Sequence, residues 1–416
     1  MMPQLLLMVC NVLHEGPFFT VYFDVLRLRC TKQKTTKQQT DMTSKTGSTA
    51  LKYSTDLKPQ SFAVVIAGTS AQIAALFYVW KEYTSFGETL SKCGSDAKCY
   101  INTNDPWSRQ IVITTGIITV TWILSLILGF GGFGHGKPGT ADPSIVDRLW
   151  SILPPLYVWG CYFATKTPSG EPSRRLLAMA VLSTMWATRL TYNFWKKGGF
   201  SGGEDYRWEH LRNWFPGWQW EAFNLVFICT FQHLLIMGFT TPAAFAMQMA
   251  ADVDANDWNV WDTIAASSYI VLFMGETIAD NQMFKFQTEK YRRKDSKKAL
   301  GPVYGRGFIW SGLWKYSRHP NYFCEVSMWW AFYLFSVASW GPDLSACCLH
   351  KEFLNWSIVP AIYLTLLFTA PGASLDFAEA LSSQKYKNYR IYQQKVSRFF
   401  PWFPAEAPKG DSKKNK

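Results

Sequence analysis

Long apolar stretches separated by short polar segments dominate the chain from residue 61 onward. A helix needs about 20 mostly apolar residues to cross a membrane. Eight stretches have a suitable length and composition, and they lie near residues 61–80, 110–133, 145–165, 174–195, 218–247, 260–286, 322–341 and 353–371. The predicted fold is therefore all-α, a polytopic bundle of about eight transmembrane helices.

The charge of the connecting segments predicts which side of the membrane each one faces. Segment 287–320 is rich in Lys and Arg, whereas segment 248–259 contains Asp residues and neither Lys nor Arg. Because basic loops favour the cytosolic side, we expect these two segments on opposite sides. Eight spans with both termini in the cytosol satisfy this constraint, although the basic loop 166–175 then falls on the wrong side.

The same orientation places the first loop, residues 81–109, in the lumen. Cys93 and Cys99 lie in this loop, and an oxidising compartment would allow them to form a disulfide. Two free thiols are an equally good interpretation of the sequence. The nine cysteines of the chain include no C-x-x-C pair, so we expect no metal site.

Composition indicates a poorly ordered N-terminal extension, residues 1–60, and a basic C-terminal tail, residues 405–416, on either side of the apolar stretches. Lys413 and Lys414 in the tail resemble a dilysine signal for return to the endoplasmic reticulum. A simple basic tail is the alternative interpretation of these two lysines.

Composition also indicates the expected partners. Charged residues make up 17% of the chain, below the roughly 25% of an ordinary soluble domain. The formal net charge is +12, but the basic residues lie beside apolar stretches rather than on a soluble basic surface. Nucleic acid is therefore not an expected partner, whereas membrane lipids are; the sequence does not predict an oligomeric state.

Polar side chains within the apolar stretches are candidates for function, because burying them in a membrane is costly. Arg189 and Asn193 end the fourth stretch, where a tight turn at the interface is the alternative interpretation. Gln232 and His233 lie in the fifth stretch, and alone they are more typical of a hydrogen-bonding pair between helices.

The sixth stretch contains two carboxylates, Glu276 and Asp280, followed by Gln282 and Lys285. Their spacing of four residues places both carboxylates on one face of a helix. In a membrane they must meet a cation, a hydrogen-bond donor or water. A purely structural ion pair is the alternative to a functional site.

The densest polar segment is 312–322, Gly-Leu-Trp-Lys-Tyr-Ser-Arg-His-Pro-Asn-Tyr. It places the guanidinium of Arg318, the imidazole of His319, the amide of Asn321 and the phenol of Tyr322 at one membrane boundary. Such a set can bind a phosphate or pyrophosphate and donate a proton nearby. A structural helix cap would not need all four groups, so we expect a functional site here.

Residues 313–323 resemble the signature of a large membrane family that includes steroid 5-alpha-reductases and sterol C14 and C7 reductases. The resemblance covers roughly residues 140–404 and is nearest to a poorly characterised branch found in bacteria and lower eukaryotes. It implies a reductase-like transmembrane domain over residues 140–404, preceded by N-terminal transmembrane helices at residues 61–139. Further matches occur in the same order at residues 150–154, 189–193, 202–207, 279–282, 379 and 385–402. Their shared order makes a chance match improbable.

The resemblance implies reduction of a carbon–carbon double bond by NADPH. The candidate cofactor-binding residues that it implies, together with the polar residues above, are Asp280, Gln282, Lys285, Arg318, His319, Asn321, Tyr322, Glu379, Arg189 and Asn193. One departure concerns Gln287, which follows Phe286 where the family usually has Lys or Arg. Because the 2′-phosphate of NADPH needs a cation, this departure leaves NADH as an alternative unless Lys285 or Lys290 replaces the charge.

The resemblance also implies a lipid-like substrate, such as a steroid, a sterol or a fatty enone, that enters laterally from the bilayer. Tyr322 is the candidate proton donor, with Glu325 or Glu276 as alternates. Two other functions remain open. One is an isoprenylcysteine-type methyltransferase that uses S-adenosylmethionine, and the other is a catalytically inactive reductase-like scaffold.

Overall fold

The computed structural model describes residues 62–83, 86–102, 106–128, 140–165, 167, 169–196, 206–215, 217–250, 257–340, 353–370, 374–386 and 388–408. All regular secondary structure in these residues is helical, as predicted. The N-terminal extension, the dilysine motif and the Gly-Gly-Glu-Asp run at 202–205 lie outside the described residues. The predicted domain boundaries stay predictions.

Each of the eight apolar stretches forms helix. In chain order they correspond to α3 (Phe62–Tyr83), α6 (Pro106–Leu128), α7 (Ser144–Leu149) with α8 (Leu153–Ala164), α9 (Arg174–Lys196), α11 (Trp218–Phe223) with η1 (Asn224–Phe231), α12 (Gln232–Phe239) and α13 (Thr241–Met249), α15 (Val260–Asp295), α17 (Pro320–Ala338), and η3 (Trp356–Ile358) with α18 (Val359–Thr369). Shorter helices connect and flank them, namely α4 (Phe86–Cys93), α5 (Ala97–Asn102), α10 (Tyr206–Trp214), α16 (Gly301–Gly305), η2 (Gly312–Lys315), α19 (Ser374–Lys385) and α20 (Tyr389–Lys395).

The predicted number of about eight membrane spans is only partly met. Among the described residues, three helical segments are both long and apolar enough to cross a membrane, and they are Ser108–Ile127, Trp218–Phe239 and Trp356–Lys385. A physical reason is evident for three of the five remaining stretches. Helices α9 and α15 are long enough but carry several charged residues, whereas α8 has 12 residues and is too short to span alone. The sides on which the termini lie stay a prediction.

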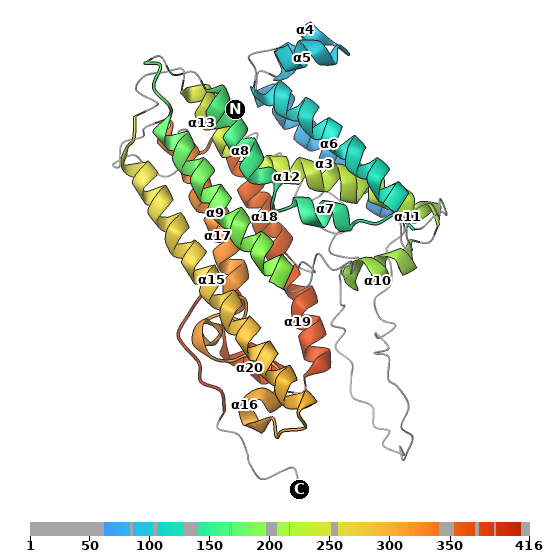
Figure 1. Cartoon of the computed structure of the whole chain (residues 1–416), viewed down its shortest axis with the longest axis vertical. Coiled ribbons are helices and arrows are strands. Elements are labelled where there is room, and N and C mark those ends of the chain that lie inside the picture. The colour runs from blue at the N-terminus through green and yellow to red at the C-terminus, as the bar shows by residue number, and fades with distance from the viewer. Residues whose placement is uncertain are drawn as a thin grey trace.

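Three long helices, α9, α15 and α17, lie side by side and form the part of the bundle that positions the site (Figure 1). Helices α4 and α5 lie at one end of the molecule, and α16 and α20 lie at the opposite end. Cys93 and Cys99 of the first group form a disulfide, with their Cα atoms 5.5 Å apart. The described helices of the first loop and the basic end of α15 with α16 are thus at opposite ends of the molecule. The side of the membrane that each faces stays a prediction.

A buried ion pair joins these three helices near their ends closest to α13. Arg175 of α9 donates to Asp262 of α15 at 2.7 and 2.8 Å, and both side chains are almost fully buried. Arg175 also donates to the backbone carbonyls of Asp257 and Ala338. Asn259 and Asp262 form a capping box at the start of α15. The pair therefore sets how α9, α15 and the end of α17 pack.

Candidate functional site

A first polar cluster lies inside the bundle, where α9, α15 and α17 meet. Arg189 of α9 donates to Glu276 of α15 at 2.6 Å, and a second nitrogen lies 3.7 Å from Asp280. Arg189 and Glu276 are both more than nine-tenths buried. Glu276 and Asp280 face the same partner because they are four residues apart on one helix, as the sequence predicts.

Asp280 links this cluster to two further candidate residues. It accepts a hydrogen bond from the amide of Asn193 at 3.0 Å and another from the amide of Asn321 at 3.2 Å. Candidate residues of α9 and α17 therefore converge on one carboxylate of α15.

The third carboxylate, Glu325, lies one turn along α17 from Asn321. It accepts hydrogen bonds from the indole N–H groups of Trp186, at 3.0 Å, and Trp329, at 2.9 Å. The sequence interpretation missed both tryptophans because apolar stretches contain many of them. The available signal was spacing, since Trp186 precedes Arg189 by three residues and Trp329 follows Glu325 by four, so each lies on the same helical face as its neighbour.

We call this set of residues the carboxylate cluster; its members are Trp186, Arg189, Asn193, Tyr269, Glu276, Asp280, Asn321, Glu325 and Trp329. Several of its buried atoms have no hydrogen-bond partner within the described part of the chain, namely Arg189 Nε and Nη1, Glu276 Oε2 and the Tyr269 hydroxyl. Buried polar groups are nearly always satisfied, so such atoms indicate a place for water or a ligand. Three carboxylates also face a single guanidinium, so the cluster needs a proton or another donor.

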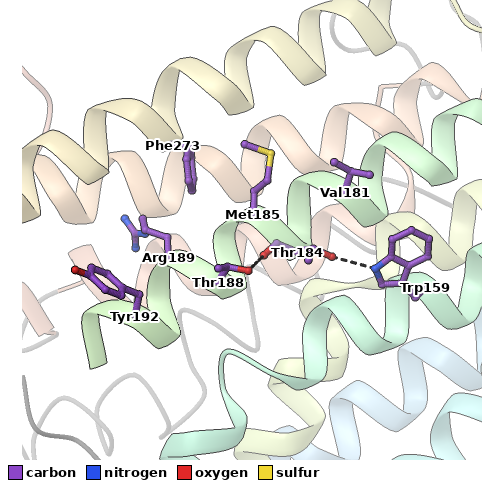
Figure 2. A pocket seen from close by; sticks show the side chains of 8 residues that line it. All are labelled: Trp159, Val181, Thr184, Met185, Thr188, Arg189, Tyr192 and Phe273. Carbon is purple, nitrogen blue, oxygen red and sulfur yellow. Dashed lines mark hydrogen bonds between the residues drawn. The ribbon is translucent and has the colours of Figure 1, made fainter. Parts of the chain in front are cut away.

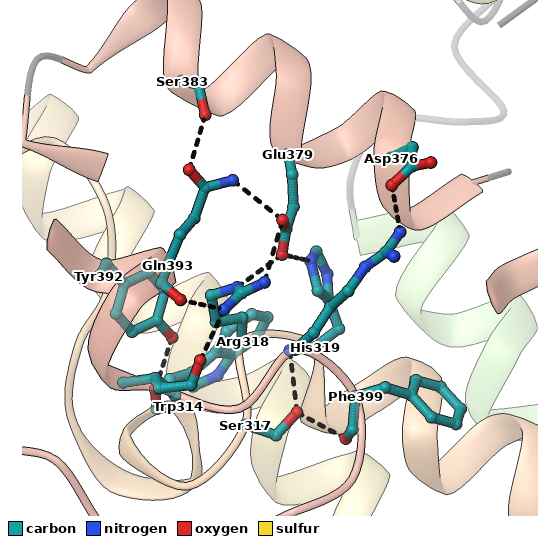
Figure 3. A network of polar contacts seen from close by, with 12 residues as sticks. Trp314, Ser317, Arg318, His319, Asp376, Glu379, Ser383, Tyr392, Gln393 and Phe399 are labelled. Carbon is teal, nitrogen blue, oxygen red and sulfur yellow. Dashed lines mark hydrogen bonds and ion pairs between the residues drawn. The ribbon is translucent and has the colours of Figure 1, made fainter. Parts of the chain in front are cut away.

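A second polar cluster lies at the start of α17, outside the carboxylate cluster (Figure 3). Arg318 forms a bidentate pair with Glu379 of α19, at 2.6 and 3.1 Å. Its remaining nitrogen donates to the backbone carbonyls of Gln393 and Val396 at 2.7 and 2.6 Å. All three guanidinium nitrogens are therefore engaged by the protein, which leaves Arg318 poorly placed to bind a phosphate.

His319 belongs to the same second cluster. Its Nε2 lies 3.2 Å from Glu379, and its ring stacks on Tyr322 with the two centroids 5.5 Å apart. Burial lowers the pKa of His319 below its ordinary value, while the contact with Glu379 acts in the opposite direction. Because the ionised carboxylate of Glu379 can only accept, the contact places a proton on Nε2 of His319. Tyr322 is half-buried and also meets the edge of Phe368 of α18.

The residues around Arg318 hold the C-terminal segment, residues 389–405, against the bundle. Ser317 donates to the carbonyl of Phe399 at 2.8 Å, and the backbone of Arg318 donates to Ser397 at 2.8 Å. Tyr392 donates to the carbonyl of Trp314 at 2.5 Å. We call the residues that make these contacts, Trp314, Ser317 and Arg318, the tail anchor. Part of the motif that the sequence interpretation assigned to a cofactor therefore holds the C-terminal segment in place.

Gln282 and Lys285 have different surroundings. The backbone N–H of Leu313 donates to Gln282 Oε1 at 2.9 Å, so Gln282 holds the turn before η2. Lys285 is exposed, two residues before the departure at Gln287. The structure therefore assigns Gln282 a backbone contact and leaves Lys285 at the surface of α15.

Replacing Gly312 by alanine is expected to destabilise the turn held by Gln282. Gly312 has a φ of +62°, and a Cβ there would overlap the Gln282 amide. Gly301 has a similar φ of +65° with open space around the corresponding Cβ, so it is the matched control. We expect Gly301→Ala to lose about 1 kcal/mol from the backbone alone and Gly312→Ala to lose more, measured by thermal denaturation in detergent. Equal effects would contradict the clash.

An apolar groove runs along the outer face of α9 and reaches the carboxylate cluster. Its volume is about 540 Å³. Figure 2 shows its lining residues spread along α9, with Trp159 of α8 at one end and Tyr192 at the other. Arg189 lines the groove and also pairs with Glu276, so an apolar molecule in the groove would lie beside the buried charges.

The helical bundle, its apolar helices and its buried ion pairs define a membrane protein with a polar centre. The chain belongs to the family described as protein of unknown function (DUF1295), whose model matches residues 139–396. It is 36% identical over 295 residues to the uncharacterized protein C594.04c of Schizosaccharomyces pombe, a match that covers 69% of this chain and 80% of that protein. No solved structure matches the chain. The region that matches the family model, residues 139–396, includes every residue of the carboxylate cluster.

Proposed function

We propose that this protein is a membrane-embedded, NADPH-dependent oxidoreductase that reduces a carbon–carbon double bond of a lipid-like substrate. The observation that carries the proposal is the carboxylate cluster, a set of buried acidic groups with unsatisfied polar atoms that adjoins an apolar groove. Ionisable groups at such a place in a membrane bundle are typical of function rather than of packing. The resemblance of residues 313–323 to the reductase signature supports the same activity.

The cofactor would be held by the end of the carboxylate cluster nearest to the basic segment. Asp280, Asn193 and Asn321 offer carboxylate and amide groups that suit the hydroxyls of a ribose and the carboxamide of a nicotinamide. Lys285, exposed a little more than one turn beyond Asp280, is the candidate partner for phosphate. Arg318 has a positioning role in this proposal, because its donors are already engaged.

When bound, NADPH supplies a hydride to one carbon of the double bond, a proton completes the other carbon, and NADP⁺ leaves. The residues of this chain would provide the proton and exclude water. Among the residues that the structure describes, Glu276 has one carboxylate oxygen without a hydrogen-bond partner, and it lies in the cluster with Tyr269 and Glu325. One of these groups is our candidate donor. Tyr322 lies at the edge of the same region and stays a further candidate.

Replacing Asp280 by alanine is expected to weaken NADPH binding at least tenfold, which corresponds to about 1.4 kcal/mol. The substitution removes the acceptor that orients Asn193 and Asn321. Asn281→Ala is the matched control, because Asn281 is the adjacent, exposed residue of the same helix. Binding to the purified protein in detergent would be measured by calorimetry with NADPH, NADH and S-adenosylmethionine.

The calorimetry separates the alternatives. If the wild-type protein binds S-adenosylmethionine and not NADPH, the proposed function changes from a reductase to a methyltransferase. Protein that binds neither would refute the proposal. If the Asp280→Ala variant keeps both its melting temperature and its NADPH affinity, the NADPH site does not include the carboxylate cluster.

A further inference from the structure

A short apolar run follows α20 and remains on the surface of the protein. Its sequence is Phe-Pro-Trp-Phe-Pro at residues 400–404, and we call it the aromatic run. The side chains of Phe400, Trp402 and Phe403 are 68, 69 and 78% exposed. Exposing three large aromatic side chains to water in one short segment is unfavourable, so the run indicates a surface that another molecule covers.

Backbone hydrogen bonds hold the aromatic run in place. The N–H of Trp402 donates to the carbonyl of Tyr316 at 2.9 Å, and the N–H of Ala405 donates to the carbonyl of Lys315 at 3.0 Å. Both acceptors lie between residues 314 and 317 of the tail anchor, so the run is fixed to the same segment of the bundle. The exposure of its aromatic side chains is therefore a property of the folded chain.

The backbone of the run is suited to surroundings of low polarity. Pro401 and Pro404 have no N–H group, and the N–H groups of Trp402 and Ala405 are bonded within the protein. Four of the five residues from 401 to 405 therefore present no N–H to their surroundings. Because unsatisfied backbone groups are costly near lipid, this segment can approach a bilayer more easily than an ordinary loop.

Ring contacts place the run at one level of the bundle. Phe400 packs against Phe323 in the first turn of α17, with the two centroids 5.7 Å apart. The neighbouring Tyr322 packs against Phe368 near the end of α18, with centroids 4.9 Å apart. Helix α18 belongs to one of the three segments that are long and apolar enough to cross a membrane. The run therefore lies beside the end of a membrane-crossing helix.

The first charged residue after α18 marks the same level. Residues 353–375 contain no Asp, Glu, Lys or Arg, and Asp376 ends this apolar stretch. Asp376 forms an ion pair with Arg398, which precedes Phe400 by two residues. A change from apolar to charged side chains marks the boundary between membrane and water, where aromatic side chains are enriched. Figure 1 shows the chain after α20 at the side of the bundle, where lipid would surround it.

We propose that the aromatic run is an interfacial membrane anchor, which inserts the side chains of Phe400, Trp402 and Phe403 into the headgroup region of the surrounding bilayer. Its partner is the lipid surface and not a second protein chain. Trp suits this depth because its ring is apolar while its N–H can reach a polar partner. The inference is independent of the proposed reductase activity, and it gives the tail anchor a second consequence, the positioning of a membrane contact.

The test uses the full-length protein in phosphatidylcholine nanodiscs. The photoreactive amino acid p-benzoyl-L-phenylalanine is incorporated at position 403 and, in a second protein, at position 402. After irradiation, mass spectrometry of the intact protein measures the fraction that carries one phospholipid. Two separate positions keep the test valid if one label disturbs the run, and thermal denaturation shows whether each labelled protein retains the wild-type midpoint.

Two further label positions provide the references. Val120 is 55% exposed on α6, within the apolar segment Ser108–Ile127, and gives the yield of a position that faces lipid. Tyr291 is the matched control, an aromatic residue that is 48% exposed on α15. It lies eleven residues beyond Asp280, or roughly 16 Å at 1.5 Å per residue. Asp280 accepts from Asn321 in the first turn of α17, so Tyr291 lies well beyond the level of the run.

Labels at positions 402 and 403 are expected to give at least about tenfold more phospholipid adduct than the label at Tyr291, with a yield near that at Val120. A lipid yield no higher than that at Tyr291 would overturn the anchor, as would cross-links to a second protein chain in place of lipid. NADPH affinity should be the same in all labelled proteins. Failure of the anchor and failure of the reductase proposal are therefore separate results.

Discussion

Arg318→Ala is expected to destabilise the protein by about 3–5 kcal/mol, because it leaves the carboxylate of Glu379 buried without its cation. Arg318 also holds the backbone carbonyls of Gln393 and Val396, which would lose their donor at the same time. The midpoint of thermal denaturation in detergent, followed by tryptophan fluorescence, should fall markedly. The C-terminal segment should become sensitive to proteolysis at lower temperature than the bundle.

The adjacent motif residue Lys315 provides the control. It pairs with Glu406 at 3.1 Å, but the side chain of Glu406 is 81% exposed. An exposed pair contributes at most about 1 kcal/mol, so Lys315→Ala should leave the midpoint nearly unchanged. The Arg318→Ala variant could instead be as stable as Lys315→Ala and lose only its NADPH binding. Arg318 would then bind the cofactor, and its assignment to the tail anchor would be wrong.

A second large effect is expected at the opposite end of the bundle. Either Arg175→Met or Asp262→Leu should destabilise the protein by about 3–5 kcal/mol, because each leaves one buried charge without its partner. The double variant should be less destabilised than the sum of the single variants, since it removes both charges together. The coupling free energy from the double-mutant cycle measures the pair.

Glu289→Ala is a suitable reference for that cycle. Glu289 accepts from Arg292 and Arg293 on the same helix, where the three side chains are partly or largely exposed. We expect a loss within about 1 kcal/mol. Additive effects of Arg175→Met and Asp262→Leu would show that the two residues are not coupled, contrary to the 2.7 Å contact.

Much of the fold was predictable because long helices leave a strong pattern in the sequence. The positions of all eight helical stretches follow from apolar length alone. The number of membrane-crossing helices did not, because stretches 174–195 and 260–286 were counted as spans although α9 and α15 carry several charged residues. Arg175, Asp262 and Arg189 are buried in ion pairs inside the bundle, and hydropathy cannot distinguish such a pair from a surface charge.

The candidate site was partly predictable for the same reason. The spacing of Glu276 and Asp280 predicts their shared face, and burial in a membrane predicts that they meet a cation, a hydrogen-bond donor or water. The structure shows a cation, Arg189. The separation of Arg318 from this cluster was not predictable. The two residues Arg318 and Asn321 are three positions apart, yet one precedes the first turn of α17 and the other lies within it, so their side chains reach different neighbours.

The tail anchor has a consequence for biosynthesis. Residues 389–405 supply the carbonyls that Arg318 and Ser317 bind, and they are synthesised after α17 and α19. The buried carboxylate of Glu379 already has its cation once α19 has been made, but two acceptors of that cation are still missing. The end of the bundle that contains α19 and α20 therefore reaches its final packing only after residues 389–405 have been translated, and until then this region is open to quality-control factors.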